Sequence, residues 1–289
     1  MISVLILTKN EEQDLPGCLE SVRWSDDIHV YDSGSADATV EIAKAAGARV
    51  TVRQLGSSSG TVFAGNEAEH KNWALKNIQF KYEWVLHLDA DERMTPELVA
   101  SVREAVQSPG ANVAFRVQRR DFFLGRWLKH VQTSPFYMRL FRPEKMRYER
   151  LVNPISVPAG PVGELSGYFD HFPFSKGTRH WLEKHNSYST LEAQQIVSNR
   201  AACNSFSIRQ AFLANDRNER RYHQKELFYR MPARPLMKFM LLYVAKRGFL
   251  DGRAGFTYAA LQSIYEYMIV LKTRELAESS NGRMPVEAS

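Results

Sequence analysis

The chain has 289 residues, of which 44% are hydrophobic and 24% are charged, with no low-complexity tract and no internal repeat. This composition is typical of a globular protein and allows a substantial core. Its two cysteines, Cys18 and Cys203, are too few for a disulfide framework or a cysteine metal site. This low number favours a location of the protein in the reducing cytoplasm.

Charge is distributed unevenly along the chain, whose formal net charge is +6. Residues 1–199 carry 23 Lys and Arg against 24 Asp and Glu, whereas residues 200–289 carry 15 against 8. The basic part should therefore meet an anionic partner, such as nucleic acid, a phosphorylated lipid or a membrane surface.

The first fifty residues alternate between strand and helix patterns. Residues 2–8 form a continuous apolar run without a preceding basic region, which predicts a first strand and not a signal peptide. The patterns that follow predict a helix over 12–22, a strand over 27–32, a helix over 35–47 and a strand over 48–53.

A Gly/Ser-rich loop at 56–60 leads into a helix around Trp73 and then into a strand that ends at Asp89. Thr95 and Pro96 are typical of the N-cap and first position of the next helix. Strands and helices that alternate in this way predict an α/β fold, with a mostly parallel sheet between helices.

Polar residues follow three of the predicted strands, at 8–11, 32–34 and 89–92. The carboxyl ends of parallel strands meet at one edge of a sheet, so these clusters should converge on one site. Asp89 and Asp91 are spaced to hold a divalent ion on a diphosphate, although a solvated loop is also compatible. The absence of glycine after the first strand excludes a dinucleotide fingerprint.

Beyond about residue 110 the pattern changes. Residues 113–123 and 137–142 alternate between apolar and polar, which predicts strands, and the chain is helical from about 181 except near Pro232, Pro235 and Gly248.

Four segments together resemble one known family. They are "ISVLILTKNEE" (2–12), "VYDSGSADATVEIA" (30–43), "HKNWAL" (70–75) and "WVLHLDADERMTPEL" (84–98). In order and spacing they resemble a family 2 glycosyltransferase with the GT-A fold, and in particular the bacterial lipopolysaccharide-core β-glucosyltransferase group. Looser similarity extends through "FFLGRWLKH", "RLFR", "HWLEKHNSYST" and "GFLDGRAGF", over most of the chain.

The resemblance implies a binding site for a nucleotide-sugar donor. We expect this donor to be UDP-linked. Asp91 would coordinate Mg²⁺ or Mn²⁺ on the diphosphate. Lys71, together with Asn72, would lie near the phosphates and stabilise the departing charge. The remaining donor-binding residues would be Asp32 at the base, Thr8, Asn10 and Glu11 beside base and ribose, and Asp89 at the ribose hydroxyls. Asp37 could instead support its own helix, and Glu92 with Arg93 could form a local ion pair.

Inversion at the anomeric carbon, which the resemblance also implies, needs a carboxylate as general base. The related enzymes lead us to expect a His-Glu pair shortly after the "RLFR" segment, where this chain has Asn153 and Pro154. Glu149 is the nearest carboxylate and our candidate base, with Asp121 and Glu164 as alternatives.

Residues 234–272 are more apolar than a soluble helical surface requires, but their longest uninterrupted apolar run, 239–245, is far shorter than the about 20 residues that span a membrane. Leu261, Ile264, Tyr265, Met268 and Leu271 share one face at helical spacing, and Arg220, Arg221, Lys225, Arg230 and Arg234 lie upstream. This pattern favours helices lying in an anionic membrane interface, whereas the alternative is a helical pair packed on the catalytic domain.

The sequence thus predicts a GT-A catalytic domain over 1–180, with a nucleotide-sugar-binding half at 1–110 and an acceptor half at 111–180. Residues 181–289 form a helical extension. The resemblance implies an inverting glycosyltransferase acting on a lipid-linked saccharide, peripheral to the cytoplasmic face of the bacterial inner membrane and without a nucleic-acid partner. The alternatives are a polyprenyl-phosphate glycosyltransferase and a non-catalytic basic membrane adaptor.

Overall fold

The computed structural model describes residues 1–53, 67–132, 134–149, 154–201, 206–214 and 217–280. The Gly/Ser-rich loop at 56–60 and Asn153 therefore lie outside the described residues. Two compact units are present, Met1–Trp127 with Thr133–Gly177, and Leu128–Gln132 with Thr178–Ser289. This division lies close to the expected boundary at residue 180, but it adds the short segment Leu128–Gln132 to the second unit.

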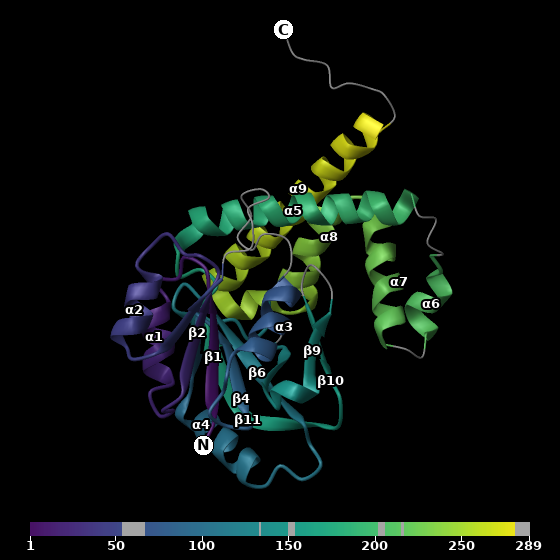
Figure 1. Cartoon of the computed structure of the whole chain (residues 1–289). Coiled ribbons are helices and arrows are strands. Elements are labelled where there is room, and N and C mark those ends of the chain that lie inside the picture. The colour runs from purple at the N-terminus through teal and green to yellow at the C-terminus, as the bar shows by residue number, and fades with distance from the viewer. Residues whose placement is uncertain (54–66, 133, 150–153, 202–205, 215–216, 281–289) are drawn as a thin grey trace. The chain divides into compact units, whose positions relative to one another are not determined.

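The first unit is an α/β structure built on one large sheet (Figure 1). Its strands are β1 (Ser3–Thr8), β2 (Ile28–Asp32), β3 (Arg49–Val52), β4 (Val85–Asp89), β5 (Glu92–Met94), β6 (Ala114–Phe123), β7 (Arg126–Trp127), β8 (Phe136–Phe141), β9 (Met146–Glu149), β10 (Ile155–Pro158) and β11 (Val162–His171). Its helices are α1 (Leu15–Ser21), α2 (Thr39–Ala45), α3 (Glu67–Asn77), α4 (Pro96–Gln107) and the 3₁₀ turn η1 (Pro143–Lys145). The predicted α/β fold is confirmed.

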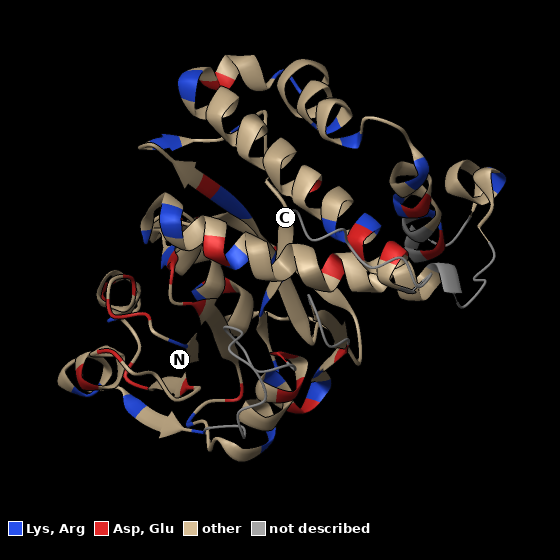
Figure 2. Ribbon diagram, turned by 90° about the horizontal axis from the view of Figure 1, so that it is seen from above, with Lys and Arg blue, Asp and Glu red and all other residues tan. Residues whose placement is uncertain are grey.

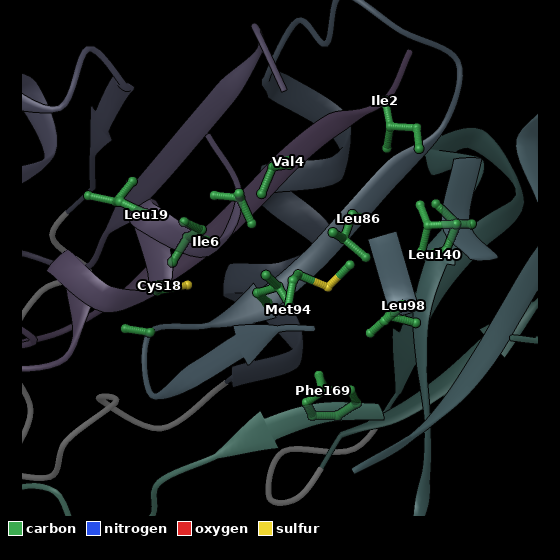
Figure 3. Close-up of a cluster of buried hydrophobic side chains, with 14 of the residues drawn as sticks. Ile2, Val4, Ile6, Cys18, Leu19, Leu86, Met94, Leu98, Leu140 and Phe169 are labelled. Atoms are coloured by element: carbon green, nitrogen blue, oxygen red, sulfur yellow. The ribbon is translucent and has the colours of Figure 1, made fainter. Parts of the chain in front are cut away.

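The two faces of the sheet bury alternate residues of the same strands. Ile6 of β1 packs with α1, α2 and α4 in one cluster, and its neighbour Leu5 packs with α3 in the other. Figure 3 shows part of the first cluster, in which Leu86 of β4 and Phe169 of β11 also meet. Strands covered on both faces explain the continuous apolar runs in the sequence.

The sheet runs in the order β3-β2-β1-β4-β8-β6-β11-β5, with β7 beside β6. The first four strands are parallel, as predicted, whereas β8 is antiparallel to both neighbours and β5 is antiparallel to β11. Because β5 follows β4 after only two residues yet pairs with β11, the sheet must curl. This curl brings the end of β11 beside the end of β4.

The N-cap predicted for α4 is also present. The hydroxyl oxygen of Thr95 accepts a hydrogen bond from the Leu98 amide at 3.3 Å, and Pro96 occupies the first turn. This arrangement ends β5 at a defined place, because Pro96 lacks the amide that an extended strand would need.

The second unit is helical in its described part. It contains α5 (Gly177–Ala201), α6 (Ile208–Leu213), α7 (Arg217–Arg230), α8 (Arg234–Met240), the π-helical turn η2 (Leu241–Ala245), the 3₁₀ turn η3 (Gly248–Asp251) and α9 (Gly252–Ser280). Ile196, Tyr229 and Ile269 form a small core between α5, α7 and α9. No helix within the described ranges is both long and apolar enough to cross a membrane.

The "GFLDGRAGF" segment has a structural role in this unit. Asp251 is buried and accepts hydrogen bonds from the amides of Lys129, His130 and Val131 at 2.8–3.3 Å, which attaches the inserted segment Leu128–Gln132. A Cβ atom on Gly255 would lie only 2.0 Å from the Gly248 carbonyl oxygen, so the turn into α9 requires glycine there.

We predict that Asp251→Ala loosens this attachment. Burial raises the pKa of Asp251, but the hydrogen bonds outweigh burial and lower it below 3.8, so the stabilisation is present above that pH and is lost as the pH falls through the folded-state pKa. Hydrogen bonds to a charged group contribute about 1.5–3 kcal/mol each. Amide hydrogen exchange at 129–131 should therefore accelerate at least about tenfold at neutral pH, with Asp251→Asn intermediate. Unchanged exchange in the Ala variant would contradict this role.

Candidate active site

Three carboxylates lie on the turn that joins β4 to β5. Asp89 and Asp91 are partly exposed, whereas Glu92 is fully buried. Glu92 accepts a hydrogen bond from the Asp89 amide at 3.0 Å, which fixes the shape of this turn. Figure 2 shows acidic residues on the loops of the first unit. The polar clusters that follow β1, β2 and β4 lie at one edge, as the parallel strands predicted.

Arg139 of β8 offsets the charge of this turn. Its guanidinium is buried and donates to Asp89 at 2.7 Å and also to Glu92. Burial by itself raises the pKa of Asp89, but Arg139 and Lys71 outweigh it and hold that pKa well below 3.8. Asp89 is therefore ionised and held in one position, ready to accept hydrogen bonds from hydroxyl groups.

The expected local ion pair between Glu92 and Arg93 is wrong. Glu92 pairs with Arg139, while Arg93 donates to the carbonyl oxygens of Ala90, Glu92 and Asp14. The reason is the alternation of a strand, which points Glu92 and Arg93 to opposite faces of β5.

We predict that Arg139→Met destabilises the first unit strongly, because it leaves the buried Glu92 carboxylate without its cation. Breaking a buried pair in this way typically costs about 3–5 kcal/mol. The matched control is Arg116→Met, whose partner Glu164 is half exposed and whose loss should cost under about 1 kcal/mol. Urea denaturation measures both variants, and equal free energies of unfolding would contradict the assigned role.

His171, the last residue of β11, lies between two aspartates. Its Nε2 is 3.2 Å from Asp91 and its Nδ1 is 2.5 Å from Asp121 of β6. Burial lowers the pKa of the imidazole, but Asp91 and Asp121 outweigh it and raise the pKa to about 9. Arg119 also fixes Asp121, because its Nε lies 2.9 Å from the same carboxylate oxygen and a second guanidinium nitrogen donates to the other oxygen at 3.3 Å, so Asp121 holds His171 in a fixed orientation.

The donor set fits a divalent cation when the Nε2 of His171 gives up its proton, because only a neutral imidazole nitrogen has a lone pair for a metal. Asp91 offers a carboxylate, and His171 offers an imidazole nitrogen whose partner nitrogen is bound by a carboxylate, as is usual for histidine ligands of metals. Within the part of the chain that the structure describes, no three His, Cys, Asp or Glu side chains are grouped as a metal site. Two protein ligands are nevertheless typical of Mg²⁺ sites in which substrate phosphates and water complete the shell.

Lys71 lies on α3 next to this edge. It is nearly buried, bonds Glu67 at 2.6 Å, and sits 5.2 Å from the centre of the Tyr148 ring. Burial lowers its pKa, but Asp89 and Glu67 outweigh burial and raise it, so the ammonium stays charged. Asn72 exchanges two hydrogen bonds of 2.8 Å with the backbone of Tyr148, which attaches β9 to α3.

The candidate donor-binding residues that end or follow β1 and β2 form a compact loop network. Asp32 is buried and accepts hydrogen bonds from the Thr8 hydroxyl at 2.9 Å, from the Ser35 hydroxyl at 2.5 Å and from the amides of Gly34 and Ser35. Asn10 adopts a left-handed backbone conformation, with φ of 55°, and accepts from the Ala36 amide. The structure therefore brings Thr8, Asn10 and Asp32 together.

Glu11 belongs to the same loop and lies beside a later segment. Its carboxylate is 2.8 Å from Lys176, which also donates to the Asn10 carbonyl oxygen at 2.7 Å. Burial raises the pKa of Glu11 to about 7 even though Lys176 acts against this shift. Asp37 bonds the Thr39 amide and hydroxyl at the start of α2, in line with the supporting role considered for it.

The three candidate bases lie in different environments. Glu149 of β9 is half exposed and pairs with Arg147 at 2.9 Å, and it directly follows Tyr148, whose hydroxyl is 3.4 Å from His87. Asp121 lies at the edge that holds Asp91, but His171 and Arg119 occupy its oxygens. Glu164 pairs with Arg116 near the opposite end of β11 from His171.

Sequence reasoning did not identify Arg139, His171 or Lys176 as site residues. Arg139 lies within the alternating segment "YMRLFR". A cation inside a predicted strand could have indicated a buried side chain that pairs with a carboxylate. His171 ends the segment "YFDH", but its relation to Asp91 depends on the pairing of β11 with β5 and β6.

The chain is similar to known glycosyltransferases over most of its length. Over 277 residues the chain is 27% identical to LpsC, a lipopolysaccharide core biosynthesis glycosyltransferase of Rhizobium meliloti, covering 94% of this chain and 91% of that protein. An uncharacterized glycosyltransferase of Rickettsia typhi is 23% identical, covering 96% and 88%. Glucosyl-3-phosphoglycerate synthase from Mycobacterium tuberculosis, solved with Mn²⁺ and UDP, is 23% identical over 42% of this chain and 44% of its own. Its TM-score of 0.34 is too low to carry an argument.

The sequence model of Glycosyl transferase family 2 matches residues 3–168, which is more than half of the chain and includes every strand from β1 to β10. The matched range contains Asp89 and Asp91, while His171 follows it by three residues. The chain belongs to glycosyltransferase family 2 and is a glycosyltransferase.

Proposed function

We propose that this glycosyltransferase transfers a sugar from a UDP-linked donor to a hydroxyl group of a lipid-linked glycan, with inversion at the anomeric carbon. The observation that carries the proposal is the arrangement of Asp91, His171 and Asp121 beside the ionised Asp89. The similarity to LpsC supports a glycan of the lipopolysaccharide-core type as acceptor.

Donor recognition is assigned to the edge of the sheet. Asp89 accepts hydrogen bonds from the ribose hydroxyls. The loop network of Thr8, Asn10, Glu11 and Asp32 lies beside the base and the ribose. Because Asp32 already accepts hydrogen bonds from its own loop, it acts on the base from a fixed position. A preorganised acceptor of this kind loses little entropy on binding.

Asp91 and His171 are the proposed protein ligands of Mg²⁺ or Mn²⁺. The metal supplies Lewis-acid stabilisation of the diphosphate charge. Lys71 adds a positive charge close to Asp89 and would stabilise the charge of the leaving diphosphate. Asp121 has no contact with substrate in this proposal, because its role is to orient His171.

The proposed base is Glu149. It takes the proton of the acceptor hydroxyl as that oxygen bonds the anomeric carbon, while the bond from this carbon to the diphosphate oxygen breaks. Glu149 suits this role better than Asp121, since His171 and Arg119 lower the pKa of Asp121 against the effect of its burial. Because asparagine and proline occupy 153 and 154, Glu149 is the carboxylate nearest in sequence to the expected position of the base.

The test is incubation with a panel of UDP- and GDP-sugars, with and without Mn²⁺. We expect hydrolysis of one UDP-sugar that depends on the metal, and faster consumption when lipopolysaccharide-core acceptor is added. Metal-independent turnover, or hydrolysis of GDP-sugars alone, contradicts the donor and metal assignments. A transfer product on polyprenyl phosphate would contradict the acceptor.

We also assign the enzyme to the cytoplasmic face of the inner membrane as a peripheral protein, without a nucleic-acid partner. The basic composition of residues 200–289 and the lipid-linked acceptor support this location. Fractionation of cells after a high-salt wash tests it, and an enzyme found entirely in the soluble fraction before the wash contradicts it.

A further inference from the structure

The second unit exposes large apolar side chains on α8, η2, η3 and the start of α9; Figure 1 labels α8 and α9. We call this surface the docking face and define it by six side chains. They are Leu236, Met240, Leu241, Val244, Phe249 and Phe256, each 46–61% exposed. Single exposed apolar residues are common on soluble proteins, but a contiguous group of this kind marks an interaction site.

Two observations make the docking face one surface. Leu236, Met240 and Val244 are spaced four residues apart and therefore lie on one side of the helical segment. The aromatic ring of Tyr243 in η2 lies 6.3 Å from that of Phe249 and 5.5 Å from that of Phe256, which joins the later turns to the same surface. The face is thus held by packing and does not depend on a loose segment.

The charges around the docking face have one sign. Residues 235–256 contain four basic residues, Lys238, Lys246, Arg247 and Arg253, and the last three are exposed. Asp251 is the single acidic residue in this range, and it is buried against the amides of 129–131. Within residues 235–256 the exposed charged side chains are therefore all cations.

The basic residues that the sequence suggested as the membrane contact are arranged differently. Arg234 is buried and paired with Glu266, and Lys225 is 2.9 Å from Glu192. Helix α7 also carries Glu219 and Glu226 among its cations. Two of the five suggested cations are therefore paired within the unit, whereas Lys246, Arg247 and Arg253 are exposed beside the docking face.

We propose that the docking face binds the surface of an anionic lipid bilayer, with its apolar side chains in the interface and its four cations at the lipid head groups. An apolar surface with a purely basic rim complements a bilayer that is apolar below an anionic layer of head groups. A second copy of the chain would bring these same cations against one another. Under the proposed function, this contact brings the enzyme to its lipid-linked acceptor. Binding to the bilayer itself requires neither donor nor acceptor.

The experiment is flotation of the full chain with two kinds of vesicle, phosphatidylcholine alone and phosphatidylcholine with about one quarter phosphatidylglycerol. Wild type should float with the anionic vesicles and much less with the neutral ones. Binding should weaken as salt rises, because the screening length is about 8 Å at physiological ionic strength. Equal flotation with both vesicles overturns the proposal.

Two variants measure separately how the apolar and the basic side chains contribute to vesicle binding. Changing Lys238, Lys246, Arg247 and Arg253 to Gln should lower the partition coefficient about 600-fold, since each basic residue near an anionic surface contributes about fivefold and the four factors multiply. Changing Leu236, Leu241, Val244 and Phe249 to Gln should remove the salt-resistant part of binding. These residues are exposed, so both variants should retain the wild-type circular dichroism spectrum.

Two matched controls test the location. Ile208, Phe212 and Leu213 of α6 are 59–67% exposed, and their change to Gln should leave flotation unchanged. Arg220, Lys225 and Arg230 of α7 changed to Gln should reduce it less than threefold. A greater effect of either control than of the docking-face variants overturns the assignment.

A self-association assay tests the alternative that a second copy of the chain binds the docking face. Dimers that appear in sedimentation and disappear in the apolar variant, without any flotation of wild type, would show that a second copy covers the face and would overturn the proposal. Metal-dependent hydrolysis of nucleotide sugar should be equal in wild type and both variants. Wild type that floats as expected but hydrolyses no nucleotide sugar contradicts the proposed function and leaves the docking face intact.

Discussion

Asp91→Asn should lose most metal-stimulated turnover, by about a hundredfold or more, while the fold remains intact. The amide keeps the shape of the side chain but removes the negative charge that a hard divalent cation requires. A bound metal contributes several kcal/mol to the stabilisation of charge in the transition state, and each 1.36 kcal/mol corresponds to a tenfold change in rate. The measurement is hydrolysis of UDP-sugar as a function of Mn²⁺ concentration.

A matched control for this experiment is Asp170→Asn. Asp170 lies next to His171 on β11, but it pairs with Arg120 and not with the proposed metal ligands. It should retain turnover within about threefold, since it changes charge near the site without touching the metal. Direct Mn²⁺ titration in the presence of UDP gives a second readout, in which Asp91→Asn and His171→Ala should both weaken binding. Wild-type activity of Asp91→Asn with Mn²⁺ present would falsify the site assignment.

Glu149→Gln should lower kcat by about 10²–10⁴ with little change in the affinity for UDP or Mn²⁺, because a general base acts only on the acceptor proton. Glu164→Gln is its matched control. Both glutamates are about half exposed and both pair with an arginine of a neighbouring position, so a general effect of the substitution should appear in both. A loss under threefold in Glu149→Gln moves the role to Asp121 or Glu164.

Asp121→Asn distinguishes a base from a positioning residue. If Asp121 orients His171, its loss should weaken Mn²⁺ binding by about 10–100-fold, as is typical for partners of histidine ligands. Saturating Mn²⁺ should then restore most of kcat. Unchanged Mn²⁺ affinity together with a kcat that no metal concentration restores would contradict the positioning role.

Much of the donor side of the site could be predicted because it is local. Asp32, Asp89 and Asp91 each follow an apolar run directly, and the parallel order of β2, β1 and β4 places such residues at one edge without further information. The N-cap at Thr95 is local for the same reason, since a helix start depends on a few consecutive residues.

The opposite side of the site depends on pairings that no local pattern encodes. His171 meets Asp91 and Asp121 only because β11 pairs with β6 on one side and β5 on the other, and Arg139 reaches Glu92 across the curled sheet. A shift of one residue in either register would turn these side chains to the other face. The ion pair considered for Glu92 and Arg93 was wrong for a local reason, because alternation along β5 points the two side chains to opposite faces.

By itself the sequence determined the alternation of strands and helices, the α/β class, the polar ends of the parallel strands and the basic character of the last ninety residues. These properties follow from hydrophobic periodicity and composition, which act over short distances along the chain. Only the tertiary structure decided which charged side chains are paired with a side chain of opposite charge. Arg234 looked like a free cation in the sequence, yet it is buried against Glu266, while Lys246 and Arg247 border the exposed apolar surface. Ion pairing depends on distances between residues far apart in sequence, and only folding sets those distances.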